Sequence, residues 1–247
     1  MKQCIGIILW ASLSFFACTP NNVKSDAGIV KILDSAGVRG SFALMENASE
    51  QFIISDLSRY KDSTYAPLQT AFAIPTLMAL DKGFINHTPA TWVSTDSISY
   101  YQALMEKIGR ADILKSMDSI HYGKGIVGTD LRSFWKDGSL RITPDEQLGF
   151  IKKLYFNELP FQKRSQDIYK KMIVKEDNAS YRLSYIQGTD NNAIPTEWFV
   201  GFIEENKHPY FFVMQISAHK NNKWNKESGN LLLKQILAEQ GFLKGVR

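Results

Sequence analysis

The chain has 247 residues, of which 44% are hydrophobic, 12% aromatic and 22% charged. This is the composition of an ordinary globular protein, which excludes a disordered chain, a collagen-like repeat and a disulfide-dense miniprotein. The net charge of +4 comes from basic residues interleaved with acidic ones, so we expect no nucleic-acid partner.

The two cysteines, Cys4 and Cys18, both lie near the start of the chain. The remainder therefore has no thiol for a disulfide, a cysteine-ligated zinc or a cysteine nucleophile. The four histidines are scattered without the spacing of metal ligands. We therefore expect neither a metal nor a cofactor.

The beginning of the chain has the pattern of an export signal. A mostly apolar run at 5–16 is too short to span a bilayer, but it is typical of the apolar part of a secretory signal. The pair Ala17–Cys18 resembles the bacterial lipoprotein signal, in which the cysteine becomes the acylated first residue. We therefore expect residues 1–17 to be a signal peptide and the exported protein to be lipid-anchored at Cys18 in the bacterial cell envelope. A plain signal peptide with an incidental cysteine is the alternative.

Apolar periodicity and turn residues predict the elements that follow. Residues 18–37 are expected to be a tether and an N-terminal segment, ahead of a single domain at 38–247. Thr143 followed by Pro144 marks a helix start. In chain order we predict strands at 41–45 and 51–55, helices at 71–80, 99–108, 112–120, 143–157 and 165–174, strands at 181–186, 197–203 and 210–216, and a helix at 231–238.

This order of elements predicts the class of fold. A strand pair, a long helical middle, three strands and a closing helix are typical of an antiparallel sheet with helices packed on it. We expect an α/β (α+β) protein with about five strands, flanking helices and a helical subdomain.

Several short segments occur in an order known from one family. They are Gly40–Leu44, Phe72–Leu80, Tyr100–Leu104, Tyr122–Gly123, Phe134–Leu140, Thr143–Gln147, Leu154–Phe161 and Trp198–Phe202. Together they resemble the class D serine β-lactamases and the related penicillin-binding, transpeptidase-like domains, over nearly all of residues 38 to 240. The resemblance implies a β-lactamase/transpeptidase-like fold.

The resemblance also implies catalytic positions, and this chain departs from the family at most of them. The family has a nucleophilic Ser-x-x-Lys, a second serine in Ser-x-Val, a Lys-Thr-Gly strand and a Tyr-Gly-Asn. The corresponding positions here hold Thr70 and Ala73, Asp96 and Ile98, Ile186-Gln187-Gly188, and Tyr122-Gly123-Lys124.

The substitutions remove the chemistry of the family. Ala73 has no amine to accept a proton, and a threonine hydroxyl without a base is barely nucleophilic at neutral pH. Ile186 cannot pair with the carboxylate of a β-lactam. We therefore assign no catalytic residue and expect no β-lactam hydrolysis. The candidates for lining a binding cleft are Thr70, Asp96, Tyr122, Lys124 and Gln187.

Three functions stay open at this point. The first is a pseudoenzyme that binds a peptidoglycan fragment or an envelope protein without acylation. The second is an active acyl-transfer enzyme of the β-lactamase or transpeptidase type, with Thr70 or an off-motif serine as nucleophile and Lys124 as base. The third is a structural envelope module whose cleft is packed shut. The off-motif serines in Ser-x-x-Lys are Ser58, Ser133 and Ser217.

We also expect Asp96 and Lys124 to face each other across the cleft as an ion pair, since both are charged where the family has neutral residues. Two unrelated solvent-facing charges are the alternative.

Overall fold

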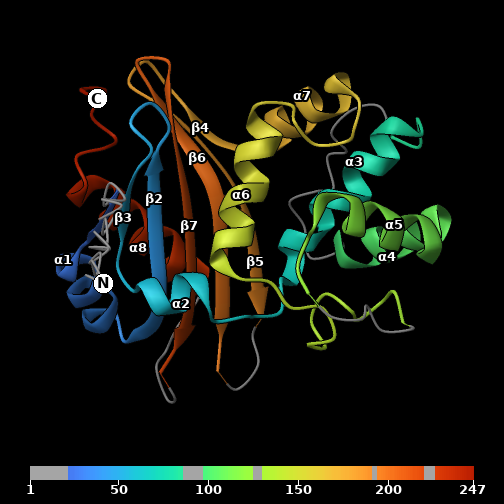
Figure 1. Ribbon diagram of the computed structural model, residues 1–247, viewed down its shortest axis with the longest axis horizontal. Coiled ribbons are helices and arrows are strands. Elements are labelled where there is room, and N and C mark those ends of the chain that lie inside the picture. Colours follow the sequence, from blue (N-terminus) through green and yellow to red (C-terminus); the bar gives the residue numbers. More distant parts are fainter. Residues whose placement is uncertain (1–21, 86–96, 125–129, 191–193, 220–225) are drawn as a thin grey trace, which may run out of the picture.

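The computed structural model describes residues 22–85, 97–124, 130–190, 194–219 and 226–247. A sheet forms the middle layer, with helices on both of its faces (Figure 1). Within the described residues the strand order is β1-β3-β2-β7-β6-β5-β4. The strands are β1 Val23–Ser25, β2 Val38–Glu46, β3 Gln51–Ile54, β4 Val174–Asp177, β5 Arg182–Asp190, β6 Thr196–Glu205 and β7 His208–Ala218.

The sheet has seven strands in the described residues, so the expectation of about five is corrected. The hairpin of β2 and β3 and the strands β5, β6 and β7 are confirmed at their predicted places. The two further strands, β1 and β4, are edge strands of three and four residues. They escaped prediction because such short edge strands bury few apolar side chains. β1 also pairs in parallel with β3, whereas the other pairs are antiparallel.

The helices predicted from apolar periodicity are confirmed to within a few residues. Two further helices precede them, α1 and α2, and each begins after an aspartate whose carboxylate accepts backbone N–H groups, Asp26 and Asp56 respectively. The helices are α1 Ala27–Ser35, α2 Leu57–Lys61, the 3-10 helix η1 Leu68–Phe72, α3 Ala73–Asp81, α4 Ser97–Ile108, α5 Arg110–Ile120, α6 Pro144–Tyr155, α7 Lys163–Met172 and α8 Lys226–Glu239.

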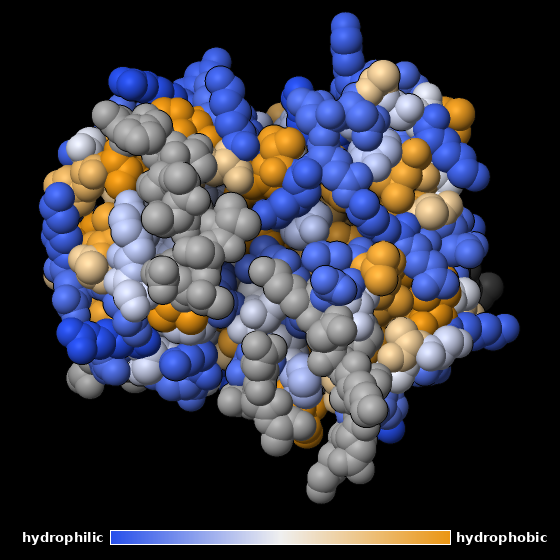
Figure 2. Space-filling view, turned by 180° about the vertical axis from the view of Figure 1, so that it is seen from behind, coloured by the Kyte–Doolittle hydropathy of each residue, from blue (hydrophilic) through white to orange (hydrophobic). Residues whose placement is uncertain are grey.

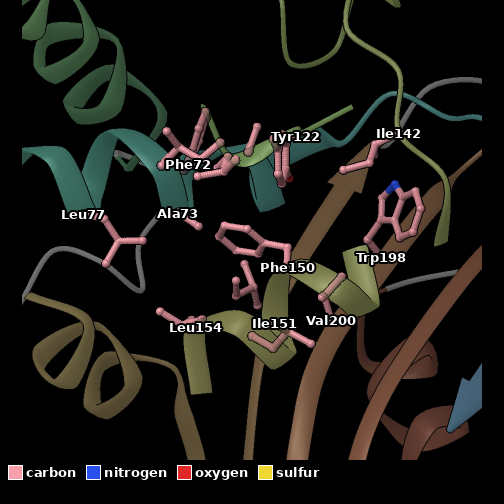
Figure 3. Close-up of a cluster of buried hydrophobic side chains, with 14 of the residues drawn as sticks. Phe72, Ala73, Leu77, Tyr122, Ile142, Phe150, Ile151, Leu154, Trp198 and Val200 are labelled. Atoms are coloured by element: carbon pink, nitrogen blue, oxygen red, sulfur yellow. The ribbon is translucent and has the colours of Figure 1, made fainter. Parts of the chain in front are cut away.

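The sheet separates two hydrophobic cores. On β6, Trp198 and Val200 belong to the larger core and Phe199 to the smaller one, because successive side chains of a strand point to opposite faces. The smaller core lies under α1 and α8. Figure 3 shows side chains of η1 and α3, of α6 and of β6 meeting in the larger core. The η1 side chain in this view is Phe72, two residues after Thr70.

None of the described helices combines the length and the hydrophobicity that a membrane span requires. On the face seen in Figure 2, hydrophobic side chains form separate small groups among hydrophilic ones. The expected signal peptide at 1–17 and Cys18 lie outside the described residues.

The close approach of β5 and β6 can be tested at Gly201 in β6, with Gly149 in α6 as a control. A Cβ atom at Gly201 would lie 2.1 Å from the carbonyl oxygen of Ser184 and 2.5 Å from Cβ of Tyr185, whereas one at Gly149 in α6 would meet no atom within 4 Å. We expect Gly201→Ala to lower the free energy of unfolding by about 1–3 kcal/mol. Gly149→Ala should raise it by about 0.5–1 kcal/mol, because alanine is the better helix former. Urea unfolding of both variants measures this, and equal effects would contradict the close approach of the two strands.

Candidate functional site

The 3-10 helix η1 carries Thr70 and is fixed by an unusual backbone conformation. Leu68 has a φ of 53°, in the left-handed region that costs a non-glycine residue about 1–2 kcal/mol. Two contacts offset this cost: the Leu68 N–H donates to the carbonyl of Trp135 at 2.9 Å, and the Leu68 side chain is buried. The turn places Thr70 in the interior, where it is 1% exposed.

The hydroxyl of Thr70 lies in a closed hydrogen-bond network. It donates to the carbonyl oxygen of Pro67 at 2.5 Å and accepts from Nε2 of Gln147 at 2.7 Å. The hydroxyl of Tyr122 lies 3.4 Å from Thr70 Oγ1 and donates to Oε1 of Gln147 at 3.3 Å. Gln147 and Tyr122 are both buried. The three side chains therefore satisfy one another without solvent.

This network does not activate Thr70. A nucleophilic hydroxyl needs a general base within hydrogen-bond reach. The Thr70 hydroxyl donates its hydrogen bond to a backbone carbonyl, which is not a general base at neutral pH. Ala73, at the lysine position of the family, begins α3 and is completely buried without an amine. Among the described residues, every group hydrogen-bonded to the Thr70 hydroxyl is uncharged.

Tyr122 cannot replace the missing base. Burial raises the pKa of its phenol well above the usual value, although the hydrogen bonds with Thr70 and Gln147 partly oppose the shift. The phenol therefore stays protonated at neutral pH, so it can donate a hydrogen bond but cannot take a proton from Thr70.

The strand β5 closes against η1 at the positions of the family's Lys-Thr-Gly. A Cβ atom at Gly188 would lie 3.0 Å from Cβ of Leu68 and 3.1 Å from the backbone nitrogen of Gln69. The side chain of Gln69 accepts a hydrogen bond from the N–H of Thr189 at 2.6 Å. This backbone donor beside Thr70 is thus occupied by the protein's own amide and is not available to a substrate carbonyl.

Lys124 lies on the surface beside this site. The segment before it turns at Gly123, whose φ is 73° and whose Cβ would lie 2.7 Å from the carbonyl oxygen of Arg141. The backbone of Lys124 pairs with Arg141 in both directions. Its side chain is exposed and lines a hollow of about 440 Å³ together with Tyr122 and Glu146. Further residues at the rim of this hollow, the Lys124 hollow, are Met117, Asp118 and His121.

The structure brings together part of the set implied by the resemblance. Thr70, Ala73, Tyr122 and Gly188 meet around η1, as described above. The remaining positions have other surroundings: Ile186 is buried in the larger core, Gln187 is half-buried on β5, and Ile98 is a half-buried residue of α4 packed against that core. Asp96 lies outside the described residues, so its ion pair with Lys124 stays a prediction.

The off-motif serines lie in three separate places. Ser58 is exposed on α2, and the lysine of its motif, Lys61, pairs with Asp145 at 3.0 Å. The hydroxyl of Ser133 donates to Asp137 at 2.9 Å. The hydroxyl of Ser217 lies 3.1 Å from that of Thr196, at the end of β7.

Sequence reasoning missed three residues of the site: Gln69, Trp135 and Gln147. For Gln147 a signal existed, because it is one and two helical turns from Ile151 and Leu154 on the inward face of α6, where a polar residue is unusual. Trp135 is 2% exposed, and its indole nitrogen has no hydrogen-bond partner among the described residues. The position of Gln69 depends on β5, which is distant in sequence, and no local pattern indicated it.

The fold and the residues around η1 define the class of protein. The sequence profile described as "Penicillin binding protein transpeptidase domain" matches residues 81–238, well over half of the chain. The protein belongs to this family. The matched range begins after Thr70 and Ala73, and so does not include them.

Characterised relatives come from two groups. The chain is 28% identical over 210 residues to the regulatory protein BlaR1 of Bacillus licheniformis, which covers 76% of this chain but only 35% of BlaR1. It is 28% identical over 201 residues to the β-lactamase OXA-48 of Klebsiella pneumoniae, covering 72% of this chain and 75% of that enzyme.

A solved structure has the same fold. The class D β-lactamase from Sebaldella termitidis superposes with a TM-score of 0.80 at 22% identity, over 90% of this chain and 99% of that one. The expected β-lactamase/transpeptidase-like fold is therefore confirmed.

The hydrogen bond between Gln147 and Thr70 can be tested by a double-mutant cycle. Thr70→Val leaves the buried amide of Gln147 without its acceptor, and we expect it to lower the free energy of unfolding by about 1–3 kcal/mol. Gln147→Leu should cost a similar amount. The double variant should lose clearly less than the sum, because the hydrogen bond between the two side chains can be lost only once. Additive losses in urea unfolding would mean that the two side chains do not interact.

Proposed function

We propose that this protein is a lipid-anchored envelope protein that has the penicillin-binding fold, does not acylate β-lactams and acts by binding. The observation that carries the proposal is the closed network at Thr70, whose hydroxyl donates to Pro67 and accepts from Gln147. A serine-type acyl transfer needs the hydroxyl exposed and paired with a base, and neither condition holds for this residue.

The large contribution of a general base to the rate of such reactions supports the proposed absence of turnover. General-base assistance contributes about 10²–10⁴-fold to such reactions, and removing one member of a catalytic set disables most of the covalent pathway. Here the amine is replaced by Ala73, the cation on the strand by Ile186, and the Thr189 N–H is occupied by Gln69. These are independent deficits, so no single compensating residue would restore the reaction.

The ligand in this proposal is a peptidoglycan fragment or an envelope protein, held without a covalent bond. The Lys124 hollow supports a binding role, because it combines an ammonium group with the carboxylates of Asp118 and Glu146. Such a mixed lining suits a peptide that carries both an amine and a carboxylate. Attachment to the membrane comes from the lipid at Cys18, in either leaflet of the envelope.

A second candidate function is a structural envelope module without a ligand. The observation that favours it is the 1% exposure of Thr70, which leaves the position of the family's nucleophile packed shut. An active acyl-transfer enzyme is the least supported candidate, since Lys124 is exposed while Thr70 is buried.

Covalent labelling tests the absence of acylation. We expect the soluble body, from residue 22 onward, to show no label and no change in intact mass after incubation with a fluorescent penicillin, because Thr70 lacks a base. A serine β-lactamase treated in parallel shows that the reagent is active, and circular dichroism shows that the protein is folded. Label that disappears in Thr70→Ala would contradict the proposal, and Lys124→Ala would then identify the recruited base.

Binding of a soluble muropeptide separates the two non-catalytic candidates. A binding protein should show shifts of NMR signals around Tyr122 and Lys124, and Lys124→Ala should weaken binding about tenfold through loss of a charge-assisted hydrogen bond. Lys31→Ala, an exposed lysine on α1, is the matched control and should have no effect. If neither a muropeptide nor an envelope protein binds at this hollow, the structural module is the better description.

A further inference from the structure

The chain becomes part of the sheet almost immediately after Cys18. The carbonyl oxygen of Asn22 accepts from the N–H of Phe52 at 2.7 Å, and the Asn22 side chain donates to the carbonyl of Glu50 at 3.0 Å. Val23 then pairs with Phe52 in the parallel register of β1 and β3. The stretch expected to be a tether up to Asp26 is therefore held by the sheet from Asn22 onward.

The remaining connection is short compared with the domain. Asn22 is four residues after Cys18, and a chain spans at most about 3.6 Å per residue, so the two residues lie within about 14 Å of each other. A domain of this length is about 45 Å across. A lipid on Cys18 would therefore hold one particular part of the domain at the bilayer and leave little freedom to turn.

The part held there is one end of the sheet. Asn22 lies beside the β2–β3 turn at 46–51, and Glu46 at the start of this turn is opposite Tyr210 near the start of β7. The β6–β7 turn at 205–208 therefore lies at the same end.

Residues 243–247 also belong to this end. Asn206 donates to the carbonyls of Gly245 and Arg247, and the buried carboxylate of Glu205 accepts from the backbone N–H of Leu243 and Arg247. We call the turns 46–51 and 205–208 and the residues 243–247 the anchored end.

The exposed basic side chains of the anchored end are Lys207, Lys244 and Arg247. They are balanced in number by the carboxylates of Glu46, Glu50 and Glu205, of which Glu205 is buried. Exposed basic side chains near a membrane are attracted to the phosphates of lipid headgroups.

The candidate site lies toward the other end of the sheet. β5 begins with Arg182 opposite Glu204, at the anchored end, and finishes with Asp190 opposite Thr196. Gly188, which contacts η1, is close to the far end of this strand. In Figure 1 the β2–β3 turn and the C-terminus are on one side of the molecule, and α4 and α5 are on the other.

We propose that the anchored end lies against the bilayer leaflet that holds the Cys18 lipid, and that the Lys124 hollow faces away from this surface. The proposal rests on the lipid anchor of the proposed function. It adds an orientation: the hollow is presented to the space in front of the membrane, where cell-wall peptides are.

Energy transfer from two labelled positions to labelled lipid tests this orientation. Cys18 is the only cysteine after the expected signal peptide, and in this proposal its sulfur carries the lipid, so a cysteine introduced elsewhere is labelled alone. Ala48→Cys in the β2–β3 turn and Ala111→Cys on α5 are matched, since both positions are exposed. The full-length lipidated protein is reconstituted into phosphatidylethanolamine–phosphatidylglycerol vesicles that contain a rhodamine lipid.

We expect transfer from position 48 to exceed transfer from position 111 by about twofold or more, given the size of the domain. Equal or reversed transfer, with the acyl chains on Cys18 verified by intact mass, would overturn the orientation while leaving the anchor intact. If the expressed protein with Cys18 intact carries no acyl chains and does not bind vesicles, the anchor itself is overturned, and the orientation with it.

A longer connection provides a second measurement. Inserting a flexible Gly-Ser segment of about 20 residues after Asn21 should bring the two transfer values close together, because the domain is then free to turn. Cys18→Ala should release the protein from the vesicles, whereas Cys4→Ala should not, since Cys4 lies within the signal peptide. An unchanged difference with the long connection would mean that the short connection does not set the orientation, and would overturn that part of the inference.

Discussion

The hydrogen bond from Gln147 to Thr70 is the interaction on which the character of this site depends. It connects α6 to η1 across the larger core and occupies the hydroxyl that a serine-type enzyme of this fold would use. An amide suits this place because it donates to Thr70 and accepts from Tyr122, so three buried polar groups are satisfied at once. A buried lysine at Ala73 would need a charge partner here, and the neutral network has none to offer.

The backbone around this bond reinforces the closure. Leu68 adopts a left-handed conformation, and the turn that it starts lies so close to β5 that a Cβ atom at position 188 would be 3.0 Å from Cβ of Leu68. The amide of Gln69 then caps the N–H of Thr189. Packing and hydrogen bonding thus keep the hydroxyl of Thr70 and the N–H of Thr189 within the protein interior and its own contacts.

The closed surroundings of Thr70 and the short connection to Cys18 both bear on where this protein can bind a ligand. The fold keeps the family's core and strand order, while its open hollow lies beside Lys124 and not at Thr70. A lipid anchor at the opposite end of the sheet would present such a hollow to the cell wall.

The sequence alone determined the class of fold, because the longer strands and the helices carry apolar patterns with periods near 2 and 3.6 that survive any change at the site. The sequence also determined the chemistry of single side chains, since neither Ala73 nor Ile186 carries an amine in any conformation. Only the tertiary structure decided the edge strands β1 and β4, which have too little buried surface to leave a pattern. It likewise decided the partners of Thr70, because Gln147 is 77 residues away and only packing brings the two together.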